Sequence, residues 1–490
     1  MKTKQKNVCH TCRAHKIGCD GKYPSCSQCL LTRRQCGGYE LSAIFVAYSP
    51  AAAATTTAGK ARSLAANQSQ SDLSIELINH GTAEACTTQL QRSSISCPIS
   101  VATSEEFAAV IVRYFIPGDK RNLLPFDSST SQVCGAWVGI LPQLAFQARP
   151  GNLLSSAIKA FGTAILDRNH SENVTDFRSY EAYTSLIQQL RRSLVVPEPT
   201  FTIHNAIAVL CLAMVEFLIR TPHESFHAHL KGLGALLQSQ YPGCFSSGVL
   251  HALFIGCRPV LLFQALQERK RTFLAQLEWI EIPFCEHRPS PMQNLLSDVA
   301  TLPSILQDTD LLPDLPHDVA MSRSRIVSLE LVGIHNRLLH WVTELDDARK
   351  CLCSHLSPVQ ESRPTRIFSS LLDASLHIHV CSFRIICLTE IKKLAVFMNL
   401  DESAAEMFEK GDLQAFELAV EICHSIEYVL QDEMELYGPI SALFPLVTAY
   451  DTLQKNRERH GPQLKYYRDL LVRIRQKGVV GGPALLHDIG

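Results

Sequence analysis

Six cysteines lie within 28 residues near the start of this chain, and their spacing constrains the fold more than any other feature. They are Cys9, Cys12, Cys19, Cys26, Cys29 and Cys36, and they follow the pattern C-x2-C-x6-C-x6-C-x2-C-x6-C, in which one half-pattern occurs twice. Two C-x2-C pairs at this separation are typical of zinc sites. A segment this short buries almost no core, so we predict that bound metal holds it together.

The ligand count predicts two zinc ions that share ligands. Structural zinc takes four ligands, so six thiolates can serve two ions only if two of the thiolates bridge both metals. The symmetry of the halves favours Cys9 and Cys26, the first cysteine of each half, as the bridging pair. The predicted ligand sets are Cys9, Cys12, Cys19 and Cys26 for one zinc, and Cys9, Cys26, Cys29 and Cys36 for the other.

The cysteine spacing, the basic residues after each C-x2-C pair, Asp20 and Pro24 together resemble the fungal Zn(2)-C6 DNA-binding domain. This domain is the binuclear zinc cluster of fungal transcription factors. The resemblance covers Cys9 to Cys36. It implies a helix from about Cys12 to Ile17 whose C-terminal end enters the DNA major groove at a CGG triplet.

The same resemblance implies which side chains contact DNA. The candidates are Arg13, His15, Lys16, Lys22, Arg33 and Arg34. Lys16 stands four positions after the second cysteine, where the family reads guanines, and a lysine can donate to guanine O6 and N7. The three arginines are predicted to contact phosphates, which position a domain without specifying sequence. His15 and Gly18 replace residues that are often basic, so we expect weaker attraction to the DNA backbone.

Two other interpretations of the cysteines are less favoured. A disulfide framework is typical of secreted domains, and the chain opens Met-Lys-Thr-Lys-Gln-Lys, without the pattern of a signal peptide. RING-like and LIM-like zinc modules need histidine ligands or longer spacers. The other 12 of the 18 cysteines lie mostly in apolar surroundings, as expected of small buried thiols in a reducing compartment.

Charge is distributed unevenly along the chain. Residues 1–40 carry a net charge of +6, whereas the whole 490-residue chain carries −1, which leaves −7 for residues 41–490. A basic N-terminal segment on a mildly acidic remainder predicts contact with nucleic acid through the N-terminal segment alone.

Composition predicts four consecutive parts. Residues 1–8 are expected to be a basic disordered N-terminus, residues 9–48 the zinc domain, residues 49–98 a flexible linker, and residues 99–490 a large all-helical domain. The linker is rich in alanine, threonine, serine, asparagine and glutamine and cannot bury a core. It contains no heptad pattern, so no coiled coil is predicted beside the zinc domain.

From about residue 100 the apolar residues recur at helical spacing, and no alternating strand pattern is present. Thr103 and Glu106 predict a capping box. The longest apolar run, Ile203 to Ile219, is interrupted by Asn205 and Glu216, so we expect a buried helix and no membrane span. The predicted helices cover roughly residues 153–166, 177–194, 203–219, 249–273, 322–344, 367–397, 415–431 and 464–476. The predicted fold is a small zinc-stapled binuclear cluster module with two short helices, a flexible linker and a large all-α domain.

The helical part resembles the fungal-specific transcription factor domain in four segments that occur in the family's order. They are Leu153 to Ala164; Met214-Val215-Glu216 with Phe226 and His229 to Gly232; Thr272-Phe273-Leu274 to Trp279; and Cys423 to Tyr428 with Gly438-Pro439 and Pro445-Leu446. The resemblance implies a regulatory or effector-sensing domain without enzymatic activity.

One motif points to different chemistry. His223-Glu224-Ser225-Phe226-His227 matches the H-E-x-x-H signature of zinc metalloproteases, in which the motif lies in the middle of a helix. Here Thr221 and Pro222 predict that a helix begins at the motif, with Glu224 as the carboxylate of a capping box. A zinc hydrolase that uses His223 and His227 is therefore the least favoured alternative.

The sequence predicts a nuclear regulator of RNA polymerase II transcription that binds two Zn²⁺ and reads CGG-like triplets in double-stranded DNA. The expected partners are promoter DNA, the transcription machinery and a second copy of the chain through the helical domain, with no membrane. Relatives often lie beside metabolic gene clusters, which makes such a cluster a candidate target. The main alternative is a zinc-cluster adaptor that binds proteins and not DNA.

Overall fold

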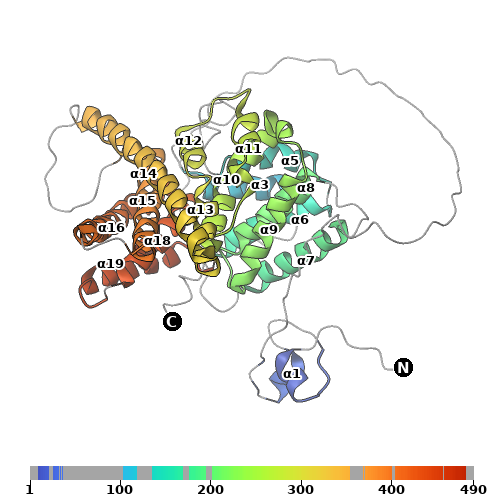
Figure 1. Ribbon diagram of the computed structural model, residues 1–490. Helices are drawn as coiled ribbons and strands as arrows, with labels where there is room; N and C mark the ends of the chain where they lie inside the picture. The colour runs from blue at the N-terminus through green and yellow to red at the C-terminus, as the bar shows by residue number, and fades with distance from the viewer. Residues whose placement is uncertain are drawn as a thin grey trace, which may run out of the picture. The chain divides into compact units, whose positions relative to one another are not determined.

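The computed structural model describes residues 9–20, 26–32, 34, 36, 103–117, 135–149, 151–168, 176–194, 201–353, 368, 370–399, 403–455 and 457–481. In these ranges every regular element is a helix, as the sequence predicts (Figure 1). The expected disordered N-terminus (1–8) and linker (49–98) lie outside the described residues. The N-terminal module (residues 9–36) and the helical body (from residue 103) are described separately.

The N-terminal module contains α1 (His10–Ala14) and α2 (Ser27–Leu31). The first part of the body contains α3 (Ser104–Phe115), α4 (Ala136–Gly139), α5 (Leu141–Gln147), α6 (Leu153–Asp167), α7 (Asp176–Leu194), α8 (Ile203–Val215) and α9 (His223–Gln238). The second part contains α10 (Gly248–Glu268), α11 (Leu277–Glu281), α12 (Pro291–Asp298), α13 (Leu302–Leu311), α14 (His317–Cys353), α15 (Leu371–Phe397), α16 (Ser403–Val429), α17 (Tyr437–Ser441), α18 (Leu443–Gln454) and α19 (Gly461–Gln476). Short 3-10 turns are η3 (Pro242–Phe245), η4 (Phe273–Ala275), η5 (Ile282–Phe284), η6 (Leu312–Asp314) and η7 (Asp432–Met434).

The long amphipathic helices were predicted better than the short ones. α6, α7 and α19 agree with the predicted ranges to within three residues at each end. α14 extends beyond its predicted range at both ends, and α16 begins well before its predicted start and ends at Val429. The short helices α11, α12 and α13 were not predicted, because a helix of two or three turns shows too few apolar repeats to reveal its period. α10 ends at Glu268, five residues before the predicted end at Phe273.

A local signal fixes the start of α3. Glu106 N–H donates to Thr103 Oγ1 at 3.3 Å, and Thr103 N–H donates to Glu106 Oε2 at 2.8 Å, so the predicted capping box is confirmed. α3 then packs on α6, where Gly162 meets Phe107. A Cβ at residue 162 would lie 2.5 Å from a ring carbon of Phe107, so a glycine is needed for this approach.

The capping box predicted for α9 is wrong. Pro222 is the N-cap residue and makes no side-chain cap, and Glu224 is exposed. Thr221 Oγ1 donates to the buried Glu216 Oε2 at 3.0 Å. The turn that carries Glu216 also ends α8 at Val215, four residues before the predicted Ile219.

Glu216 is 1% exposed and is satisfied by a polar network inside the body. His229 Nε2 lies 2.9 Å from Glu216 Oε1, and Tyr183 OH donates to the same oxygen. Burial, together with the adjacent carboxylate, raises the pKa of Tyr183, so its phenol remains a donor. These contacts join α7 and α9 to the turn after α8.

The two most apolar long helices lie inside the body. α10 contacts α4, α9 and α13, and α15 contacts α14, α16 and α18. By length and composition both could cross a membrane, but 72% of the apolar window of α10 and 78% of that of α15 are buried within the protein. Their apolar surface is therefore used for packing between helices.

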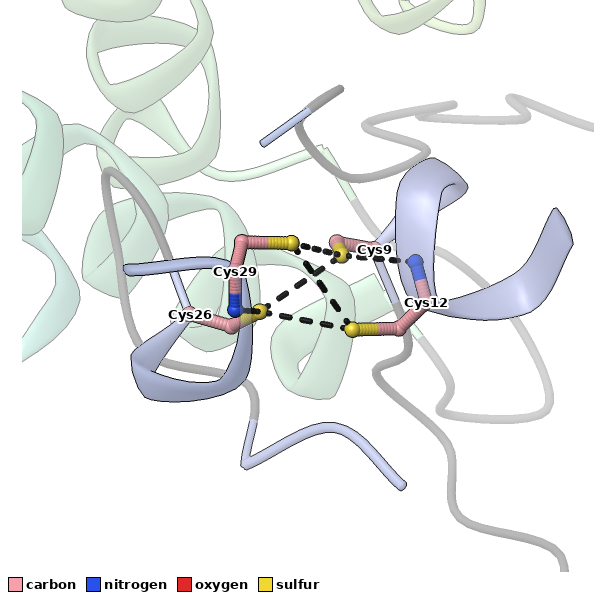
Figure 2. Close-up of side chains that lie close together, drawn as sticks. All are labelled: Cys9, Cys12, Cys26 and Cys29. Carbon is pink, nitrogen blue, oxygen red and sulfur yellow. Dashed lines mark hydrogen bonds between the residues drawn. The ribbon is translucent and has the colours of Figure 1, made fainter. Parts of the chain in front are cut away.

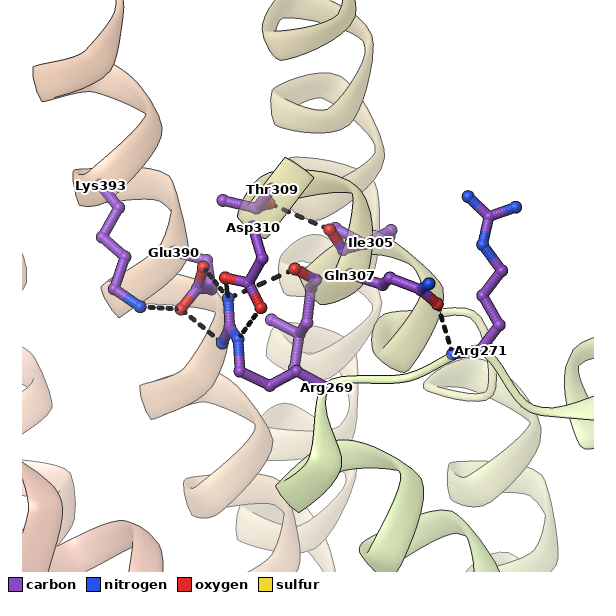
Figure 3. Close-up of polar contacts among 9 residues, drawn as sticks. Arg269, Arg271, Ile305, Gln307, Thr309, Asp310, Glu390 and Lys393 are labelled. Carbon is purple, nitrogen blue, oxygen red and sulfur yellow. Dashed lines mark hydrogen bonds and ion pairs between the residues drawn. The ribbon is translucent and has the colours of Figure 1, made fainter. Parts of the chain in front are cut away.

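Arg269 follows the last residue of α10 and ties this helix to α13 and α15 (Figure 3). Its φ of 52° is left-handed, which is uncommon for a residue other than glycine. Its guanidinium donates to both carboxylate oxygens of Asp310, at 2.6 and 2.7 Å, and to both of Glu390, each at 3.0 Å. Glu390 is buried and also accepts from Lys393 Nζ at 2.6 Å. The left-handed turn at Arg269 explains why α10 ends early.

We expect Arg269→Ala to lower the free energy of unfolding of the full chain by about 2–4 kcal/mol, because it leaves the buried Glu390 carboxylate with Lys393 as its remaining cation. Arg271→Ala is the matched control, since the Arg271 side chain is 60% exposed where it pairs with Asp308. Its expected cost is about 0–1 kcal/mol. Denaturant titration measures both, and equal costs would show that the Arg269 pairs add nothing.

Candidate zinc centre

The N-terminal module brings cysteines from both halves of the pattern together (Figure 2). Cys9 immediately precedes α1, which carries Cys12, and Cys26 is the N-cap of α2, which carries Cys29. All four side chains are at most 1% exposed. The other two cysteines of the pattern pack against this group.

The distances between sulfurs match those of a zinc–thiolate site. Cys9 Sγ lies 3.7 Å from the Sγ atoms of Cys26 and Cys29, and Cys12 Sγ lies 3.5 Å from Cys26 Sγ and 3.8 Å from Cys29 Sγ. A tetrahedral zinc ion with Zn–S bonds of about 2.3 Å places its sulfurs about 3.8 Å apart. All six cysteines of the pattern are free of disulfides. The residues therefore fit bound zinc and not a disulfide framework.

The same thiols need a cation in order to ionise. Burial, with the nearby Cys26 thiol, raises the pKa of Cys29 to about 12, and burial also raises the pKa of Cys9 and of Cys12. Zinc is bound by the thiolate form, so binding must release these protons. The charge of the metal is what allows several thiolates to lie this close together.

The two halves share the same local structure around their first cysteine. Cys12 N–H donates to Cys9 Sγ at 3.3 Å, and Cys29 N–H donates to Cys26 Sγ at 3.3 Å. The repeat in spacing is therefore also a repeat in structure. Cys9 and Cys26 hold equivalent places in it, and their assignment as the bridging pair stays a prediction.

α1 differs from the helix that the family resemblance implied. The expected range was about Cys12 to Ile17, whereas α1 spans His10–Ala14. Lys16 has a left-handed φ of 52°, and Ile17 N–H donates back to Cys12 O at 3.0 Å, as in a Schellman helix end. Lys16 is exposed and lies just beyond the end of α1. The next residue, Ile17, is hydrogen-bonded to Cys12 of the cluster.

Two further candidate DNA contacts can be placed. His15 and Arg34 are both exposed, and Arg34 N–H donates to Cys29 O at 2.9 Å, as Ile17 does to Cys12 in the first half. The side chain of Arg13, and the whole of Lys22 and Arg33, lie outside the described residues.

Asp20 has a role that the sequence did not reveal. Its Oδ1 accepts from Ser27 N–H at 3.0 Å in the first turn of α2, where a negative charge is favourable. A carboxylate oxygen of Asp20 and the Sγ atoms of Cys19 and Cys26 lie within 4.8 Å of one another. Asp20 thus links the end of the first half to the start of the second, a contact that depends on the folded turn.

One more group in the described part of the chain has metal-ligand geometry. The ligand atoms of His377, Cys381 and Glu421 lie within 4.8 Å of one another, with His377 Nε2 3.0 Å from Glu421 Oε1. The i, i+4 spacing of His377 and Cys381 on α15 is visible in the sequence. Glu421 comes from α16, and only packing brings it to them.

The H-E-x-x-H motif does not assemble in the same way. Glu224 is exposed, and His227 Nδ1 lies 3.5 Å from Glu268 Oε1. The side chain of His223 lies outside the described residues. Of the groups with metal-ligand geometry in the described ranges, none includes Glu224 or His227.

Residues 7–43 match the model of the fungal Zn(2)-Cys(6) binuclear cluster domain. The match spans all six cysteines and supports zinc binding, DNA binding and transcription regulation of the fungal Zn(2)-C6 type. This domain binds two zinc ions, which are the cofactor of the segment. No curated protein and no solved structure matches the chain.

We expect elemental analysis of the full-length protein to find two zinc ions per chain, both bound within residues 9–36. A chelator should unfold this segment and leave the helical body intact, because the segment has almost no core of its own. Circular dichroism reports whether the helical body stays folded, and cysteine alkylation reports whether the cysteines of residues 9–36 stay protected. A single zinc, or cysteines that stay protected in chelator, would contradict the expectation; a third zinc would point to His377, Cys381 and Glu421.

The bridging assignment predicts different losses for different cysteines. Cys26→Ser should impair both metal sites, whereas Cys36→Ser should impair one and retain about one zinc ion per chain, because the predicted ligand sets share only the bridging pair. Cys244→Ser, at an exposed cysteine of the body, is the control and should retain both ions. Equal zinc loss from Cys26→Ser and Cys36→Ser would count against the assignment.

Proposed function

We propose that this chain, which carries a fungal Zn(2)-Cys(6) cluster domain at its N-terminus, is a nuclear, sequence-specific regulator of RNA polymerase II transcription that reads CGG-like triplets. The observation that carries the proposal is the placement of Lys16 next to the metal cluster. Its side chain is exposed, while its backbone is held by the Ile17-to-Cys12 hydrogen bond. A lysine held at a helix end in this way can enter the major groove and donate to guanine.

Charge supports the same proposal. The net +6 of residues 1–40 favours a polyanion, and the net −7 of the remaining chain does not. His15, Lys16 and Arg34 are exposed in the described part of the module. We propose that Arg34, together with Arg13, Lys22 and Arg33, contacts phosphates and that Lys16 supplies base recognition.

We propose that residues 99–490 form a regulatory domain of the fungal-specific transcription factor type, joined to the zinc domain (9–48) by a linker (49–98). One of the segments that resemble this family contains Glu216 and His229, which meet in the buried network between the α8 turn and α9. Such a domain regulates and does not catalyse. A metabolic gene cluster is its candidate target, and genome-wide occupancy of the tagged protein would identify the genes.

The competing function is a zinc-cluster adaptor that binds proteins and not DNA. It shares the cysteine cluster but makes no use of an exposed lysine at the end of α1. One measurement distinguishes the two functions: an adaptor binds two zinc ions yet shows no salt-dependent binding to DNA.

We expect Lys16→Gly to remove about 1–3 kcal/mol of preference for CGG over scrambled triplets. Glycine adopts the left-handed backbone of residue 16 at no steric cost, so the variant should keep its zinc and its fold. Binding assays with both DNA sequences measure the preference. A variant that still discriminates fully would show that another side chain reads the triplet.

Arg34→Ala is the matched comparison on the other half of the module. It should weaken binding to all DNA sequences alike and reduce the slope of log affinity against log salt by about 1, because it removes one phosphate contact. A selective loss of CGG binding in this variant would reverse the roles assigned to the two residues.

A triplet is too short to specify one site in a genome, so we propose that the protein dimerises through the helical body and binds paired triplets. We expect a fragment of residues 1–80 to be monomeric and to bind DNA weakly, and the full chain to bind paired triplets tightly. Light scattering and binding assays on both proteins test this. A dimeric fragment would place the contact before residue 80 instead.

A further inference from the structure

The helical body contains an apolar cavity lined by residues of α3, α4, α8, α9, α10, α15, α17 and α18. The space open to the centre of a water molecule is about 90 Å³. One water needs about 10–15 Å³ by this measure, so the cavity has room for a small organic molecule. Aromatic rings form much of the wall: Phe115, Trp137, Phe217, Phe263, Tyr437 and Phe444.

The wall has few polar side chains. Two of them, Gln264 and Ser441, already donate hydrogen bonds within the protein. Gln264 Nε2 donates to His227 O at 3.1 Å, and Ser441 Oγ donates to Gly438 O at 2.8 Å. The described residues that line the cavity include no aspartate, glutamate, lysine or arginine. A charged ligand would therefore lose its hydration and gain no counter-ion.

Two polar atoms on residues of the wall are buried and have no hydrogen-bond partner in the described part of the chain. They are Ser375 Oγ and His379 Nε2, and both residues are 2% exposed. They stand one turn apart on α15. An unsatisfied polar atom inside a protein is costly, and a bound molecule can satisfy it.

The hydrogen bond on the other side of the His379 ring defines what Nε2 can accept. Nδ1 lies 2.6 Å from Ser375 O, and a carbonyl only accepts, so Nδ1 carries the proton. Burial lowers the pKa of His379 to about 4, so the ring is neutral near pH 7. Nε2 is then an acceptor and needs a donor.

Aromatic rings cover one side of the His379 imidazole. Phe263 stacks on His379 with ring centroids 5.0 Å apart, and Phe444 lies nearly parallel to it at 6.1 Å. Phe263 and Phe444 are themselves stacked with centroids 4.5 Å apart, so both lie on the same side of the imidazole. Because the Nδ1 edge meets a carbonyl, Nε2 is the polar contact that the ring can still offer.

We propose that this cavity binds an uncharged, largely aromatic small molecule that donates one O–H or N–H hydrogen bond to His379 Nε2, with Ser375 Oγ as a second contact. The aromatic wall supplies the affinity, and the single acceptor supplies the selectivity. The inference concerns the helical body alone and does not depend on DNA binding by the zinc module.

Phenol and toluene are a matched pair of probes for this site, because they have nearly the same size and only phenol donates a hydrogen bond. Calorimetric titration of the full-length protein should show phenol binding about tenfold more tightly than toluene, the value of one hydrogen bond to a buried acceptor. This comparison requires no variant. Equal affinities would show that water already satisfies Nε2 and would overturn the proposal, as would a failure of both probes to bind.

Three variants locate the binding. His379→Phe should abolish the preference for phenol and leave toluene binding, and Val260→Phe should abolish both by filling the cavity. His251→Phe is the control: His251 is also buried, with Nδ1 2.9 Å from Phe245 O, but it does not line the cavity. The His251→Phe variant should bind phenol and toluene as the unmodified protein does. A phenol preference that survives His379→Phe would place the acceptor elsewhere and refute the assignment.

Discussion

The N-terminal module depends on the attraction between zinc and thiolates, because little else is available to hold it. Five of its six cysteines are at most 5% exposed, and in the described ranges Ile17 is the one hydrophobic residue other than a cysteine that packs against them. Sulfurs at 3.5–3.8 Å would repel one another as bare thiolates. Cys12, one of these cysteines, also accepts the Ile17 hydrogen bond at the end of α1, beside which Lys16 stands. The helical body is held instead by the packing of apolar helices, which are largely buried.

The cysteine cluster was predictable because its ligands are encoded by spacing, and each half forms the same local turn. The end of α1 was not predictable from the residues. His10 to Ala14 contains no helix-stopping residue, and Lys16 is a poor choice for a left-handed conformation on propensity alone. Its conformation follows from the Ile17-to-Cys12 hydrogen bond beside the metal site. Asp20 likewise acquires its contact with Ser27 only in the folded module.

In the helical body, one sequence pattern had two outcomes. Thr103 with Glu106 and Thr221 with Glu224 both match a capping box, and the first pair forms one. The second does not: Pro222 is the N-cap residue of α9, and Thr221 donates to the buried Glu216. The two pairs differ in what surrounds them, and the spacing of the pattern does not show that. The cavity shows the same limit. The sequence predicts the long helix that carries Ser375 and His379, but it does not predict which rings of other helices lie near them.

The Arg269 contacts have a kinetic consequence for anything held in that cavity. Val260 and Phe263 of α10 form one wall and His379 of α15 another, and Arg269 joins the end of α10 to Glu390 of α15. Moving these two helices apart would separate a guanidinium from a buried carboxylate, at a cost of several kcal/mol. A guest would therefore enter and leave the cavity by a route that keeps α10 and α15 together.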